Sequence, residues 1–114
     1  MITKFDEFLK TKKMVEVIIT YDISKEFDPF YSKFKTWLES QNPSTLTEST
    51  YKLKGFYYFE QLEKFEIEII KIFDESQKIF ESKSTATYKS VIIFIIPENN
   101  QLLEKVILNK TKEK

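Results

Sequence analysis

The chain has 114 residues, 41% of them hydrophobic and 16% aromatic, and its 18 basic residues balance 18 acidic ones. Histidine, cysteine and arginine are absent, which excludes histidine-based catalysis, thiolate chemistry, disulfides and bidentate arginine recognition of phosphate or guanine. Size and composition predict one soluble α+β domain over 1–114, and the lack of a signal-peptide core or a long apolar run favours the cytoplasm without membrane contact.

Periodic apolar residues predict the first elements. Four apolar positions among charges indicate a short N-terminal helix over 1–13. Alternating valine and isoleucine predict a strand over 14–21, and Ile18 on its other side suggests a central strand. A broad apolar stripe over 27–38 predicts a helix with Asp28 as its N-cap.

The middle of the chain is predicted to hold two strands and a second helix. Asn42-Pro43 should stop the first helix, and alternation predicts a strand over 44–54. Gly55, the only glycine, marks a turn, and 56–59 is predicted as a short third strand. A helix follows from about Glu60, with an apolar face of leucine, isoleucine and phenylalanine.

The last part of the chain is predicted to form a strand over 87–96 and then a helix. Segment 98–114 is interpreted as a C-terminal helix before a lysine-rich tail, on the spacing of Leu102, Leu103, Val106 and Ile107. The core, 14–97, therefore has the order βαβ(β)αβ. That order predicts a ferredoxin-like βαββαβ sandwich, an antiparallel sheet with two helices on one face.

Three short motifs in this core carry a family resemblance. The first strand ends in Tyr21-Asp22 after hydrophobic residues, the next helix ends near Trp37-Leu38, and the second strand contains Glu48-Ser49-Thr50-Tyr51. In these motifs the chain resembles the Cas2 and VapD-like group of small ferredoxin-like proteins. The resemblance implies a homodimer built by pairing sheets, with Asp22 of each protomer facing the dimer cleft. In active members that aspartate pair holds a divalent metal, Mg²⁺ or Mn²⁺, for phosphodiester cleavage, which implies Asp22 as catalytic and metal-binding residue and Ser49 as its polar neighbour.

Residue chemistry leaves alternatives open at these positions. Asp22, followed by Ser24, is typical of a residue that caps a turn, and from the residues alone this interpretation is favoured over a metal ligand. Two further sets admit both a binding and a packing role: Tyr51 in the strand motif, and the aromatic run of Phe56, Tyr57, Tyr58 and Phe59. The run is interpreted either as a stacking platform for single-stranded bases or as packing in the core or at a dimer interface.

Three functions follow as hypotheses. The first is a non-catalytic, homodimeric Cas2-like interaction module linked to nucleic-acid or phage-defence biology, with lysine-rich ends for non-specific phosphate contact. The second is a divalent-metal-dependent endonuclease that uses Asp22 from both protomers. The third is an inhibitor or adaptor of a larger protein, whose acidic helix mimics nucleic-acid charge through Glu60, Glu63, Glu66 and Glu68.

Overall fold

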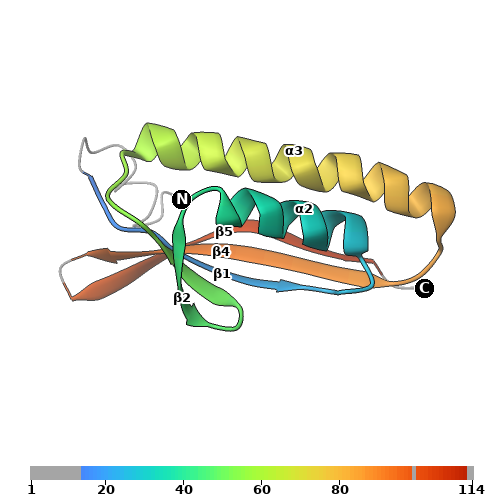
Figure 1. The fold of residues 1–114 in the computed structure, drawn as a ribbon, viewed down its shortest axis with the longest axis horizontal. Coiled ribbons are helices and arrows are strands. Elements are labelled where there is room, and N and C mark those ends of the chain that lie inside the picture. The colour runs from blue at the N-terminus through green and yellow to red at the C-terminus, as the bar shows by residue number, and fades with distance from the viewer. Residues whose placement is uncertain (1–13, 99, 113–114) are drawn as a thin grey trace, which may run out of the picture.

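The structure, a computed structural model, describes residues 14–98 and 100–112 (Figure 1). It is a mixed α+β fold in which two helices lie on one side of a five-stranded antiparallel sheet with the order β2-β3-β1-β4-β5. The elements are β1 (Ile18–Ile23), α2 (Asp28–Glu39), β2 (Pro43–Thr47), β3 (Thr50–Leu53), α3 (Phe59–Lys83), β4 (Tyr88–Glu98) and β5 (Gln101–Lys112). The predicted α+β class is confirmed, and the helix predicted over 1–13 lies outside the described residues.

Strand β1 is the centre of the sheet, as its sequence predicted. It pairs antiparallel with β3 on one side and with β4 on the other, and Ile19 stands between Tyr51 and Phe94. Burial alternates along β1, so that Ile19, Tyr21 and Ile23 are buried beneath the helices. The residues between them therefore point to the other side of the sheet.

Helix α2 forms where the apolar stripe predicted it, but its start differs from the prediction. Asp28 is the first helical residue, Phe27 takes the N-cap position, and no side chain caps the helix. The Asp28 carboxylate instead accepts a 2.9 Å hydrogen bond from Ser32 Oγ, one turn along. The buried Phe27 ring, stacked on Tyr88 at 4.3 Å between centroids, fixes the entry of the helix by packing.

The segment predicted as one strand over 44–54 is a hairpin, β2 and β3. The chain reverses around Glu48 and Ser49, where Thr47 Oγ1 accepts a hydrogen bond from Ser49 N at 3.4 Å. Such side-chain to backbone bonds let threonine and serine compete with a continuous strand. The third strand is therefore made from residues before Gly55.

The strand predicted over 56–59 is wrong. Gly55 adopts φ +90°, which turns the chain away from β3, and only Tyr57 remains paired, through an isolated bridge to Val15. Phe59 is already the first residue of α3. Four consecutive aromatic residues fit a strand by propensity, but α3 begins within the run and continues for 25 residues.

The C-terminal helix predicted within 98–114 is also wrong, because this segment forms β5. It pairs with β4 from Tyr88↔Lys112 to Glu98↔Gln101, after a reversal at which Asn100 has φ +63°. A register shift between Ile92 and Ile93 allows the adjacent Ile107 and Leu108 both to be buried. Apolar residues at this spacing fit either element, and the unpaired edge of the long, apolar β4 strand decides in favour of a strand.

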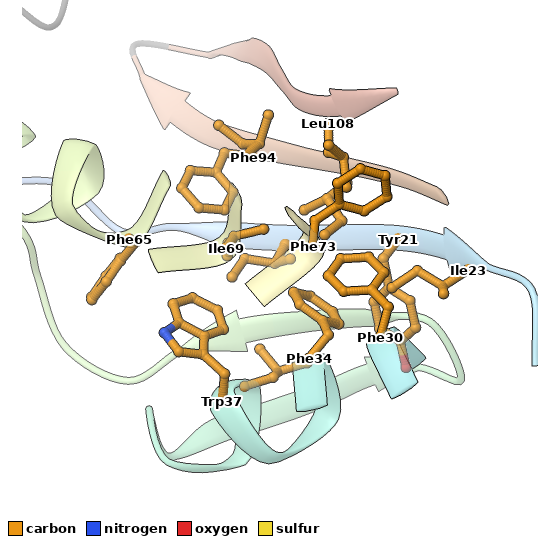
Figure 2. Packing of buried hydrophobic residues seen from close by; sticks show 14 of the residues in the cluster. Tyr21, Ile23, Phe30, Phe34, Trp37, Phe65, Ile69, Phe73, Phe94 and Leu108 are labelled. Atoms are coloured by element: carbon orange, nitrogen blue, oxygen red, sulfur yellow. The ribbon is translucent and has the colours of Figure 1, made fainter. Parts of the chain in front are cut away.

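The core lies between the sheet and the helices (Figure 2). Phe30, Phe34 and Trp37 reach into it from α2, and Ile69 and Phe73 from α3. Large aromatic rings bury much apolar area per residue, which suits a chain with a single core. Neither helix in the described part of the chain combines the length and the apolar character needed to cross a membrane.

Candidate functional site

Asp22 lies near the end of β1 on the side of the sheet away from the helices. Its carboxylate forms a 3.0 Å ion pair with Lys89 Nζ of β4, and its side chain is 67% exposed. The turn after β1 is held by Ser24, whose Oγ accepts from Lys89 N at 2.9 Å and whose N donates to Lys89 O at 2.9 Å. Ser24 therefore joins the turn to the start of β4, and Asp22 presents its carboxylate to solvent.

Asp22 and Ser49 line the same surface hollow. The carbonyl of Ser49 accepts a 3.1 Å hydrogen bond from Tyr21 N, so the β2–β3 turn lies against the end of β1. A surface hollow of about 500 Å³ opens there, which we call the Asp22 hollow. It is lined by Thr20, Tyr21, Asp22, Ile23, Lys25, Tyr31, Glu48, Ser49, Val91 and Ile93.

Two acidic residues, Asp22 and Glu48, line the Asp22 hollow together with Ser49. Among the described residues, no group of three or more acidic side chains is placed to hold a metal ion. Mg²⁺ and Mn²⁺ take oxygen ligands, retain several waters and are commonly bound through one or two carboxylates. The described part of one protomer contributes at most two carboxylates to this hollow, those of Asp22 and Glu48.

Tyr51 belongs to a second group of polar side chains, which sequence analysis did not identify. Lys35 of α2 donates hydrogen bonds from Nζ to Tyr51 Oη at 2.7 Å and to Tyr21 Oη at 3.2 Å. The two phenol rings stack at 6.1 Å, and the Lys35 ammonium lies 4.6 Å from the Tyr51 ring centroid. We call these three residues the Lys35 cluster.

The Lys35 cluster shifts the acidity of its members in different directions. Hydrogen bonding from Lys35 lowers the pKa of Tyr51, because the ammonium stabilises the phenolate. Burial raises the pKa of Tyr21, and this outweighs the same lysine. The pKa of Lys35 rises against the effect of its own burial, because both phenols accept hydrogen bonds from its charged form. The sequence contains no specific signal for the cluster, because a lysine that follows a buried residue such as Phe34 on an amphipathic helix ordinarily faces solvent.

The residues of the aromatic run differ in their contacts and exposure. Tyr57 is half-buried, packs its ring against Phe65 at 5.4 Å and donates from Oη to Lys54 O at 2.9 Å. Phe56 and Tyr58 are 57% and 44% exposed and lie in the connection to α3. Tyr57 therefore packs, and the other two remain open to a partner.

The side of the sheet opposite the helices carries an apolar strip that no described element covers. Its members are the half-buried Ile18, Val91, Ile93 and Ile95 and the 54% exposed Val106, which is paired with Ile93. We call this strip and its polar neighbours the open sheet face. Around it, Lys52 pairs with Glu16 at 3.1 Å and Lys89 pairs with Asp22, and the exposed Glu104 lies opposite Ile95.

Two carboxylates of the predicted acidic helix are engaged inside the chain. Glu66 pairs with Lys105 of β5 at 3.2 Å, and Glu68 accepts a 2.8 Å hydrogen bond from Trp37 Nε1. Glu60 and Glu63 are exposed. The acidic surface of α3 is thus smaller than the sequence suggests.

These features describe two neighbouring groups, the Asp22 hollow and the Lys35 cluster, beside an uncovered apolar sheet face. The Asp22 hollow has room for a cation, the Lys35 cluster contains a phenol with a lowered pKa, and the open sheet face is available to a second chain. Comparison of the chain with protein-family models, with curated proteins and with solved structures found no match in any of the three.

Proposed function

We propose that this protein is a homodimeric interaction module that pairs through the open sheet face. The observation that carries the proposal is the uncovered strip of Ile18, Val91, Ile93, Ile95 and Val106. Contiguous apolar surface of this kind marks interaction sites. In a two-fold dimer, the same strip of each protomer would cover its counterpart.

The charges around the strip favour a second copy over nucleic acid. The ion pairs Lys52–Glu16 and Lys89–Asp22 neutralise both of these lysines, and the exposed Glu104 opposite Ile95 adds negative charge to the rim. Binding of nucleic acid needs uncompensated positive charge, which these residues do not provide. On β5, Lys105 and Lys112 are paired with Glu66 and Glu81, which reduces the basic surface further.

The fold type and the biological setting belong to the same proposal. The first six elements of the described residues read βαββαβ, with β1 between β3 and β4, which supports a ferredoxin-like sandwich extended by β5. We interpret the Tyr21-Asp22 and Ser49 motifs as Cas2- or VapD-like. On that interpretation the module acts in the cytoplasm, in nucleic-acid or phage-defence biology, with a further protein as its partner.

The test is the oligomeric state of three proteins. Wild type should sediment as a dimer, and a variant with Ile93→Lys and Ile95→Lys should be a folded monomer. Leu46→Lys, at a 52% exposed position on the edge strand β2, should remain dimeric and controls for the added charge. The proposal would be refuted if wild type were monomeric at micromolar concentration, or if the variant with Ile93→Lys and Ile95→Lys still formed a dimer.

A metal-dependent nuclease is the second candidate, favoured by the shared location of Asp22, Glu48 and Ser49 in one hollow. Two protomers would together provide four carboxylates, enough for one hydrated Mg²⁺ or Mn²⁺. Wild type should then cleave labelled DNA and RNA in the presence of either cation. The Asp22→Ala variant should not cleave them, and neither should wild type after a chelator has removed the cation. Dimeric wild type that cleaves neither nucleic acid would exclude this candidate and leave the interaction module standing.

A further inference from the structure

We propose that Tyr51 is a nucleophilic tyrosine and that its hydroxyl is a covalent modification site for small activated acyl donors. The proposal rests on the geometry of the Lys35 cluster and does not depend on dimerisation or on a metal. A phenol reacts as its phenolate, so the protein must both stabilise that anion and leave it accessible.

Stabilisation comes from an ammonium that the fold holds in place. Lys35 Nζ lies 2.7 Å from Tyr51 Oη, and Lys35 is itself half-buried on α2. The buried Tyr21 ring stacks against Tyr51 at 6.1 Å and limits how far the phenol can move. Partial burial strengthens the attraction between ammonium and phenolate, because less water screens it.

The other charged groups around Tyr51 do not cancel this effect. Glu39, also on α2, opposes ionisation of Tyr51 by charge repulsion, but the hydrogen bond from Lys35 is the larger influence and the pKa of Tyr51 is lowered. On the β2–β3 turn, the near group is the backbone carbonyl of Glu48, 3.4 Å from Tyr51 Oη. The neutral phenol donates to this carbonyl, and ionisation gives up that long contact.

Access separates the two phenols that share Lys35. Tyr21 is only 7% exposed, and burial raises its pKa, so its phenolate is both disfavoured and shielded. Tyr51 is half-buried at the end of the sheet, with its pKa lowered by the same lysine. Only Tyr51 combines an anion-stabilising partner with contact to solvent.

The expected step is acyl transfer. The Tyr51 oxygen attacks the carbonyl carbon of the donor, a new C–O ester bond forms, and the bond from that carbon to its leaving group breaks. The phenolic proton ends on the leaving group through water. With N-acetylimidazole as donor, the products are O-acetyl-Tyr51 and neutral imidazole, and no oxidant or metal is needed.

The experiment measures acetylation of each tyrosine by N-acetylimidazole, using peptide mass spectrometry at early times. Hydroxylamine removes acetyl groups from tyrosine oxygen and leaves acetyl-lysine intact, which identifies the ester. Tyr58 is the internal reference: it is 44% exposed, so exposure alone predicts that it reacts before half-buried Tyr51. We expect Tyr51 to be acetylated first.

Variants on α2 separate activation from packing. In Lys35→Met, Tyr51 should no longer be acetylated before Tyr58. In Lys35→Arg, which keeps the positive charge, Tyr51 should still be acetylated first. Lys33→Met, at an exposed position on the same helix, is the matched control and should react like wild type. Spectrophotometric titration of the tyrosines gives a second readout. The ionisation that occurs at the lowest pH in wild type should be absent from Tyr51→Phe. Tyr58 reacting first in wild type, or Lys35→Met and Lys33→Met behaving alike, would overturn the proposal.

Discussion

Trp37 Nε1 donates a 2.8 Å hydrogen bond to Glu68 Oε2, which links α2 to α3 across their contact. The indole is 9% exposed and packs edge-on against Phe65 at 5.5 Å, so this polar contact lies at the rim of the core. From the sequence alone, Glu68 is one of the four acidic residues expected to face a partner. Its position indicates that it stabilises the packing of the two helices.

Removing the Glu68 carboxylate should therefore destabilise the protein. Glu68→Ala is expected to lower the free energy of unfolding by about 1–3 kcal/mol, because a nearly buried indole N–H loses a charged acceptor. Glu63→Ala, on the exposed side of α3, should change it by less than about 0.5 kcal/mol. Urea unfolding of both variants checks this, and equal effects would show that the hydrogen bond contributes nothing to stability.

The identity of the C-terminal element gives a second stability prediction. Leu108 is 5% exposed in β5, whereas Leu102 is 65% exposed. Leu108→Ala should cost about 2–4 kcal/mol by opening a cavity, and Leu102→Ala less than about 0.5 kcal/mol. An amphipathic helix would place Leu102 on the apolar face, so the opposite ranking in urea unfolding at one protein concentration would contradict the strand.

The sequence was sufficient to predict an element where the spacing of its apolar residues fits only a helix or only a strand. Phe30, Phe34 and Trp37 recur at helical spacing and are buried, and the alternating β1 residues place that strand at the centre. It was insufficient where the outcome depended on distant partners. The edge of β4 selects a strand at 101–112, and the turn at Glu48 and Ser49 follows from local hydrogen bonds that a propensity pattern does not contain.

The candidate site likewise contains residues that the sequence identifies and residues that it does not. The motifs single out Asp22 and Ser49, and both line the Asp22 hollow. Lys35 was not identified, because a lysine beside an apolar stripe ordinarily extends its charge into solvent. Its contacts with Tyr21 and Tyr51 arise only when α2 is laid across β1 and β3, a relationship that no spacing along one element reveals.

The exposed ion pair at the end of β1 leads to a third prediction. Asp22 and Lys89 have side chains that are 67% and 55% exposed, so their 3.0 Å contact is well screened by water and salt. Asp22→Asn should change the free energy of unfolding by less than about 1 kcal/mol, and 0.5 M NaCl should abolish the difference. Thermal unfolding at low and high salt measures both, and a larger loss that persists in salt would reveal a structural role for Asp22.

Tyr57 gives a prediction about alkaline pH. Its Oη donates to Lys54 O at 2.9 Å, and burial raises its pKa above the ordinary value of 10. The folded state thus retains the phenolic proton to higher pH than the unfolded state does. Stability from this group is fully present below pH 10 and is lost as the pH rises through the raised value.

Tyr57→Phe removes both the hydrogen bond and this titration. At pH 7 the variant should be less stable than wild type by about 0.5–1.5 kcal/mol, the usual contribution of one neutral hydrogen bond. Above pH 10 wild type loses stability at Tyr57 and the variant does not, so the difference should shrink as the pH rises. Urea unfolding at pH 7 and at several values above 10 measures this difference, and Tyr58→Phe, at an exposed site, is the matched control. A gap between Tyr57→Phe and wild type that stays constant or widens above pH 10 would mean that burial does not favour the neutral phenol.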